Sequence, residues 1–153
     1  MHPRSGRRGD CYRESAAFSQ PPDADCRAVS CAIENGDAHR KNFSVIYDHP
    51  ESEVRFAPAY DILSTTPYIP RDTLALTLNG TKQFPARSEL IQFIRRVIAR
   101  SERAAIEILD RVAHGVDIAI KEAREYAREH PDGRKFSDRL IKALTRGMDR
   151  LAA

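Results

Sequence analysis

Four polar side chains that could take part in catalysis lie within six positions of one short segment. They are Asp37, His39, Lys41 and Asn42, in the stretch NGDAHRKN at 35–42. Asn-Gly-Asp alone is typical of an ordinary turn, but four functional groups so close together indicate a site. A further carboxylate, Asp61, follows a predicted strand and precedes an apolar pair. A charge is expected there only if it caps a helix or binds a cation.

Phosphoryl transfer gives the two acids and the amide a common role. The reaction needs one carboxylate to accept the proton of the acceptor hydroxyl, and oxygen ligands to hold Mg²⁺ against the nucleotide phosphates. In protein kinases the base Asp and a metal-binding Asn are five residues apart, and a second metal-binding Asp follows. Here Asp37 and Asn42 are five residues apart, and Asp61 lies 24 residues beyond Asp37. The spacing therefore predicts a phosphoryl-transfer site.

Short strands must position these groups. Residues 43–47 and 54–57 are rich in β-branched and aromatic residues or alternate in polarity, and turn residues occupy 48–52. This pattern predicts a β-hairpin between Asn42 and Asp61. Residues 73–78 alternate again and end at an Asn-Gly pair, which predicts a further strand.

The second half of the sequence has a helical period. An apolar stripe begins after Ser88, and Ser101 is placed to cap a second helix. A third helix is expected over about 116–129, and a last one capped by Ser137. Strands followed by a mostly helical bundle predict an α+β fold.

Two segments resemble the catalytic and metal-binding segments of HipA-type serine/threonine kinases, the toxins of bacterial toxin–antitoxin pairs. They are NGDAHRKNFS at 35–44 and APAYDILSTT at 57–66. The resemblance runs from about residue 32 to the end and implies a protein-kinase-like C-terminal lobe over 32–153. Residues 1–31 do not resemble the family and hold all three cysteines. We expect them to form a largely disordered N-terminal arm.

The resemblance implies a role for each polar residue. Asp37 would be the catalytic base, and Asn42 and Asp61 would bind Mg²⁺ through their oxygens. His39 and Lys41 would lie beside the ATP phosphates, and Tyr60 would line the nucleotide site. For His39, a loop histidine hydrogen-bonded to the backbone is an equal alternative.

The resemblance also implies partners. Full-length relatives phosphorylate a serine on a protein of translation, typically an aminoacyl-tRNA synthetase, and are neutralised by a HipB-like, DNA-binding antitoxin. Kinases grip ATP with a glycine-rich loop and a strand lysine. The seven glycines here form no such loop, and residues 1–31 contain no lysine. We therefore expect a truncated chain that transfers phosphate weakly or not at all by itself, with an unusual N-terminus as the alternative.

Composition limits the class of protein. The 153 residues are 41% hydrophobic and 31% charged, which is typical of one globular domain. Neither a membrane-spanning stretch nor a secretory signal is present, so we expect a cytoplasmic protein without membrane contact. The 25 basic and 22 acidic residues are interspersed, which disfavours direct binding of nucleic acid.

Two other functions remain open. The chain could be a non-catalytic interaction module that binds an antitoxin-like partner through a basic helix face at Arg95, Arg96, Arg100 and Arg103. Alternatively, Asp37, His39 and Asp61 could form a metal-dependent hydrolase site, but that interpretation leaves Lys41 and Asn42 without a role.

Overall fold

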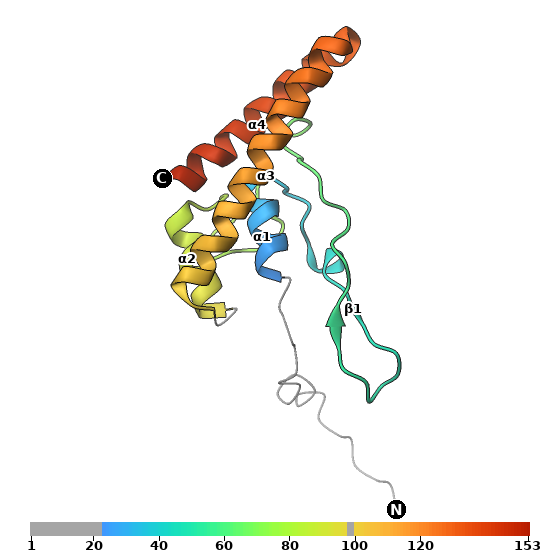
Figure 1. Cartoon of the computed structure of the whole chain (residues 1–153), viewed down its shortest axis with the longest axis vertical. Helices are drawn as coiled ribbons and strands as arrows, with labels where there is room; N and C mark the ends of the chain where they lie inside the picture. The colour runs from blue at the N-terminus through green and yellow to red at the C-terminus, as the bar shows by residue number, and fades with distance from the viewer. Residues whose placement is uncertain (1–22, 98–99) are drawn as a thin grey trace, which may run out of the picture.

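The computed structural model of the chain describes residues 23–97 and 100–153 (Figure 1). The described helices are α1 (Asp23–Ala32), α2 (Arg87–Val97), α3 (Glu102–Glu129) and α4 (Arg134–Ala152). Two short 3₁₀ helices, η1 (Arg40–Asn42) and η2 (Pro131–Gly133), and two strands, β1 (Val45–Ile46) and β2 (Arg55–Phe56), complete the order.

The described residues are mostly helical with one small antiparallel sheet, in line with the predicted α+β class. Among the helices of this part of the chain, none is both long and apolar enough to cross a bilayer. The predicted arm up to residue 22 lies outside the described residues.

Helix α3 is the centre of the helical body, and α1, α2 and α4 all pack against it (Figure 1). Its buried residues recur every three or four positions, as expected for an amphipathic helix: Ala105, Ile108, Leu109, Val112, Val116 and Ile120. The hydroxyl of Ser101 accepts a hydrogen bond from the Ala104 amide at 3.2 Å, so the predicted cap is confirmed.

The structure corrects the predicted helix boundaries in the second half. Residues 102–129 form one helix instead of two, because the apolar stripe continues with the same period past the exposed Gly115. The predicted end of this helix before Pro131 is confirmed. The last helix begins at Arg134, so the predicted cap at Ser137 is wrong. The Ser137 hydroxyl lies inside α4 and donates to the Gly133 carbonyl at 3.3 Å.

Residues 23–31 belong to α1, so the predicted disordered arm does not extend to residue 31. The buried side chains of α1 are small: Ala24, Ala28, Ser30, Cys31 and Ala32. Such residues give a weak hydrophobic pattern, yet they let α1 lie close against α3 and α4. The Arg27 guanidinium lies 4.9 Å from the centre of the Phe43 ring and 5.5 Å from that of Phe93. Arg27 thereby joins α1 to the segment before β1 and to α2.

The predicted hairpin is present but short. Strands β1 and β2 pair antiparallel, with Val45 opposite Phe56 and Ile46 opposite Arg55. The hairpin extends away from the helical body (Figure 1). The prediction of a strand at 73–78 is wrong, because only Leu78 of this segment forms a β-bridge, to Thr81. The Asn-Gly pair does make the turn between those two residues, with positive φ angles of 50° and 82°.

Gly147 allows α4 to cross the end of α1. A Cβ atom at this position would lie 1.6 Å from the Ala32 carbonyl oxygen, a distance that no packing adjustment of side chains relieves. Gly115, in contrast, has no heavy atom within 4 Å of the corresponding position.

We predict that Gly147→Ala and Gly115→Ala change stability in opposite directions. Gly147→Ala forces the backbones of α1 and α4 apart and should lower the free energy of unfolding by about 1–3 kcal/mol. Gly115→Ala improves helix propensity and should raise it by about 0.5–1 kcal/mol. Urea unfolding followed by circular dichroism measures both changes. Equal destabilisation by the two variants would contradict the close approach at Gly147.

Candidate functional site

Asn42 and Asp61, the two predicted magnesium ligands, are in direct contact. The Asn42 side-chain amide donates a hydrogen bond to Oδ2 of Asp61 at 2.6 Å. Asn42 ends η1 just before β1, and Asp61 follows β2, so the hairpin brings together two residues that are 19 positions apart. Both side chains lie at the base of the β-ribbon.

A backbone hydrogen bond orients the Asn42 side chain, and Asp61 has an unusual backbone conformation. Oδ1 of Asn42 accepts a hydrogen bond from the His39 amide at 3.1 Å, and this sets which side of the amide faces Asp61. Asp61 has a φ angle of 57°, in the left-handed region that Asp adopts more readily than most residues. Conformations of this kind often occur at functional sites.

The donor chemistry of this pair fits Mg²⁺. A carboxylate and an amide oxygen are hard ligands, and Mg²⁺ is usually bound by one or two such groups together with water and phosphate oxygens. The amide oxygen of Asn42 keeps a second lone pair beyond the one used by His39. In residues 23–97 and 100–153, no three His, Cys, Asp or Glu side chains gather to hold a metal ion. Asp37, His39 and Asp61, the ligands of the hydrolase alternative, therefore do not form such a group among the described residues.

Tyr60 ties the two sides of the site together. Its hydroxyl donates to the Lys41 carbonyl oxygen and lies 2.7 Å from Oγ of Ser44. Tyr60 and Lys41 are both exposed. The predicted nucleotide-site tyrosine thus also braces the segment that holds Lys41 and Asn42.

Asp37 stands on a turn that leads into η1. Its amide donates to Oδ1 of the buried Asn35 at 3.0 Å, and its carbonyl accepts from the His39 amide at 2.7 Å. The Asp37 side chain is exposed, and within the described part of the chain no hydrogen bond or ion pair joins its carboxylate to Asn42 or Asp61. Nδ1 of His39 is buried without a hydrogen-bond partner.

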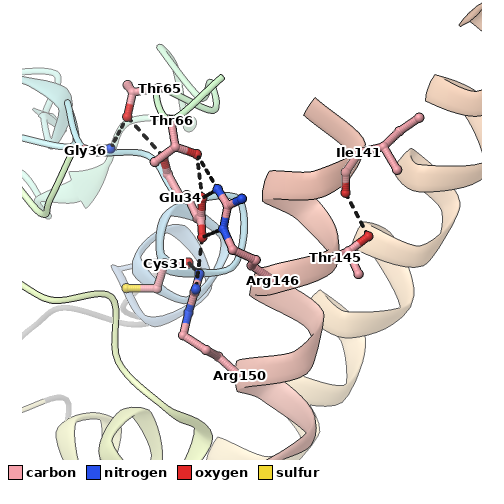
Figure 2. Close-up of polar contacts among 9 residues, drawn as sticks. All are labelled: Cys31, Glu34, Gly36, Thr65, Thr66, Ile141, Thr145, Arg146 and Arg150. Carbon is pink, nitrogen blue, oxygen red and sulfur yellow. Dashed lines mark hydrogen bonds and ion pairs between the residues drawn. The ribbon is translucent and has the colours of Figure 1, made fainter. Parts of the chain in front are cut away.

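A buried glutamate, Glu34, lies just before this turn. It joins its own segment to the segment after Asp61 and to α4 (Figure 2). Only 3% of its side chain is exposed. Its carboxylate accepts hydrogen bonds from Arg146 at 3.1 and 2.5 Å and from Arg150 at 2.9 Å, both on α4. It also accepts one from the Thr66 hydroxyl at 2.5 Å.

The backbone around Glu34 reinforces the same connection. The Glu34 carbonyl accepts from both the amide and the hydroxyl of Thr65, each at 3.1 Å. The Thr65 hydroxyl in turn accepts from the Gly36 amide at 2.8 Å. We call Glu34, Thr65, Thr66, Arg146 and Arg150 the Glu34 cluster. It fastens the segment that precedes Asp37 to the segment that follows Asp61.

A family model described as the HipA-like C-terminal domain matches residues 24–120, which is more than half of the chain. The chain belongs to this HipA family. The match begins inside segment 1–31, which was expected to lie outside the family, and it includes α1. It ends before α4, so Arg146 and Arg150 lie beyond the matched region.

Two curated relatives, both from Sinorhizobium fredii (strain NBRC 101917 / NGR234), are similar to this HipA-family chain. One, named "Putative kinase Y4dM", is 37% identical over 89 residues, which are 58% of this chain and 21% of that protein. The other, "Putative kinase Y4mE", is 43% identical over 65 residues, which are 39% of this chain and 15% of that protein. The chain thus spans about a fifth or less of the length of these relatives. No solved structure gives a significant match.

The Glu34 cluster was not predicted from the sequence. Thr65 and Thr66 belong to the segment that carries the HipA resemblance, but their own types suggested no role. Glu34 follows a helix end, where a charged residue is normally exposed. Arg146 and Arg150 are one helical turn apart on α4, and this i, i+4 spacing is the signal that was available.

The pKa of Glu34 lies below its ordinary value. Burial alone would raise it, but hydrogen bonds from Arg146, Thr66 and Arg150 favour the ionised form and outweigh burial. A lowered pKa in the folded state means that the ionised carboxylate stabilises the fold at neutral pH. This contribution is lost as the pH falls from about 4.3, the usual pKa of Glu, through the lower folded value.

We predict that Glu34→Gln lowers the free energy of unfolding at pH 7 by about 2–3 kcal/mol. Removing one partner of a buried ion pair costs about 3–5 kcal/mol, and the half-exposed Arg146 side chain (51%) reduces this here. The difference between wild type and variant should shrink as the pH falls below about 4. Urea unfolding at several pH values measures it, with Glu107→Gln, at an exposed ion pair on α3, as the control. A pH-independent difference would contradict the role of the ionised carboxylate.

Proposed function

We propose that this chain supplies the catalytic-loop and metal-ligand part of a HipA-family serine/threonine protein kinase. The observation that carries the proposal is the contact between Asn42 and Asp61 at the base of the hairpin. The kinase names of the two relatives and the family match support it. The spacing of Asp37, Asn42 and Asp61 follows the order in which kinases use these groups.

In this proposal Asp37 is the catalytic base. Its exposed carboxylate accepts the proton of a serine hydroxyl, and the serine oxygen attacks the γ-phosphorus of ATP. The bond from that phosphorus to the β–γ bridging oxygen breaks, and ADP leaves. Mg²⁺, when bound, neutralises charge on the phosphate oxygens. Oxygens of Asn42 and Asp61 are the groups of this chain that would hold it.

The other polar residues complete the nucleotide side. Lys41 is an exposed compact positive charge, suited to a phosphate oxygen. The unpartnered Nδ1 of His39 has hydrogen-bonding capacity that the described residues do not use. The ring of Tyr60 would line the nucleotide site while its hydroxyl holds the Lys41 carbonyl.

The HipA resemblance supports more specific proposals for substrate and partner. We propose a protein substrate of the translation machinery, such as an aminoacyl-tRNA synthetase, and neutralisation by a HipB-like antitoxin. The glycine-rich loop and strand lysine that kinases use for ATP do not occur in this sequence. We therefore propose that phosphoryl transfer by this chain alone is slow or absent.

The alternative of a non-catalytic arginine-rich binding face has less support. Arg95 forms an ion pair with Glu102 at 3.0 Å, and Arg103 forms one with Glu107 at 2.9 Å. Two of the four arginines are thus partly neutralised within the chain. What favours this alternative is a shallow hollow that Arg95, Arg96 and Arg100 line near the start of α3.

We predict that Mn²⁺, used as a paramagnetic substitute for Mg²⁺, binds to oxygens of Asn42 and Asp61 and replaces the direct hydrogen bond between the two side chains. Nuclear magnetic resonance of the ¹⁵N-labelled chain should show the strongest broadening at the amides of residues 40–43 and 60–62. Asp61→Asn removes the charged ligand and should weaken Mn²⁺ binding by about tenfold or more.

Asp48→Asn is the matched control, because Asp48 is an exposed carboxylate in the turn of the same hairpin. It should leave broadening at the base of the hairpin unchanged. Broadening centred on other acidic residues, or unchanged by Asp61→Asn, would contradict the proposed metal ligands.

A further inference from the structure

A second hollow surface lies far from the candidate site, at the end of the α3–α4 hairpin that projects beyond the rest of the described chain (Figure 1). It is a groove of about 630 Å³ between the last turns of α3 and the first turns of α4. We call it the hairpin groove. Its lining residues are Lys121, Arg124, Ala127, Arg128, Pro131, Arg134, Asp138 and Ile141.

The walls of the hairpin groove are strongly basic. Four cations face a single carboxylate, that of Asp138, and all four are exposed. On α3 the cations at 121, 124 and 128 share one face, because residues three or four positions apart are neighbours on a helix. The acidic residues of this part of α3 follow a different stripe, at 122, 125 and 129. The groove therefore carries a local excess of positive charge, although basic and acidic residues are nearly balanced over the whole chain.

The internal contacts of the described residues leave most of this charge available. Lys121 forms an ion pair with Asp117 at 2.6 Å, one turn earlier on α3. Asp117 is exposed, and such a surface pair contributes little to stability. Within residues 100–153, no carboxylate forms an ion pair with Arg128 or Arg134. A negatively charged ligand would therefore not have to displace a strong internal partner.

Three residues that line the hairpin groove are apolar, and we call this part of the lining its floor. They are Ala127, Pro131 and Ile141, one each from α3, η2 and α4. Phosphate backbones of nucleic acids are bound by basic and polar groups, and an apolar floor adds nothing to such contacts. A protein segment with one apolar side and acidic flanks matches both the floor and the walls.

We propose that the hairpin groove binds an acidic amphipathic segment of a partner protein. Apolar side chains of that segment would cover Ala127 and Ile141, and its carboxylates would pair with Arg124, Arg128 and Arg134. Charge complementarity of this kind contributes mainly to association rate and specificity. The proposal does not depend on the kinase function, because no residue of the candidate site lines this groove.

The test uses a fluorescein-labelled synthetic helix of 16 residues, with Leu on one face and Glu on both flanks, and measures fluorescence anisotropy with the full chain. We expect saturable binding that weakens as the salt concentration rises, since the charges are exposed. The double variant Arg124→Glu/Arg128→Glu should weaken binding by about tenfold or more. Circular dichroism and urea unfolding of each variant verify that it is folded.

Lys135→Glu/Arg139→Glu is the matched control. It changes the net charge equally at exposed positions of α4 that do not line the groove, and binding should change by less than about threefold. A peptide with Ser in place of Leu should bind at least about tenfold more weakly, because the apolar floor is then unused. Absence of binding, equal loss in both double variants, undiminished binding of the Ser peptide, or tighter binding of a DNA duplex through Arg124 and Arg128 would overturn the proposal.

Discussion

The buried carboxylate of Glu34 is the constraint on which the candidate site depends. It is charged, almost fully enclosed, and satisfied by groups from the loop after Asp61 and from α4. An ionised group in such a position is tolerated only when its partners are complete, and removing one leaves an uncompensated charge. Because those partners lie up to 116 residues away, a single side chain requires the segment that carries the candidate site and the last helix to be assembled together.

The candidate site thus consists of buried residues that hold the backbone and of exposed polar side chains. Buried Thr65, Thr66 and Asn35 hold the backbone that leads into Asp37 and out of Asp61. The side chains of Asp37, Lys41 and Asp61 are exposed, as the proposed contacts with ligands from solvent require. Helix α4 lies beyond the region matched by the HipA family model, yet its Arg146 and Arg150 pair with Glu34. The Glu34 cluster therefore links the family segment to the C-terminal helix.

Local patterns predicted the hairpin, the start of α2, the Ser101 cap and the end of α3, because turn residues and apolar periods act over short distances. They also singled out Asn42 and Asp61, which the hairpin brings into contact. These patterns failed where tertiary packing determines the structure. Helix α1 is buried through alanines that carry little hydrophobic signal. The last helix starts before Ser137, which therefore lies inside it. Glu34 could not be recognised, because nothing in its neighbourhood shows that two arginines more than 110 residues later neutralise it.

Hydrogen exchange at the amides of Gly36 and Thr65 tests most directly whether the Glu34 cluster holds the site together. Both amides donate within the connection, to the Thr65 hydroxyl and the Glu34 carbonyl respectively. Arg146→Met changes a side chain on α4 that is far from both amides in the sequence but contacts Glu34. Arg139→Met, on the same helix, is the control. If the Glu34 cluster holds the site together, Arg146→Met should speed exchange at these two amides by about tenfold or more, beyond any change at Leu109 in the core. Exchange at Gly36 and Thr65 that stays at the wild-type rate, or that rises only in step with Leu109, would contradict this role of the Glu34 cluster.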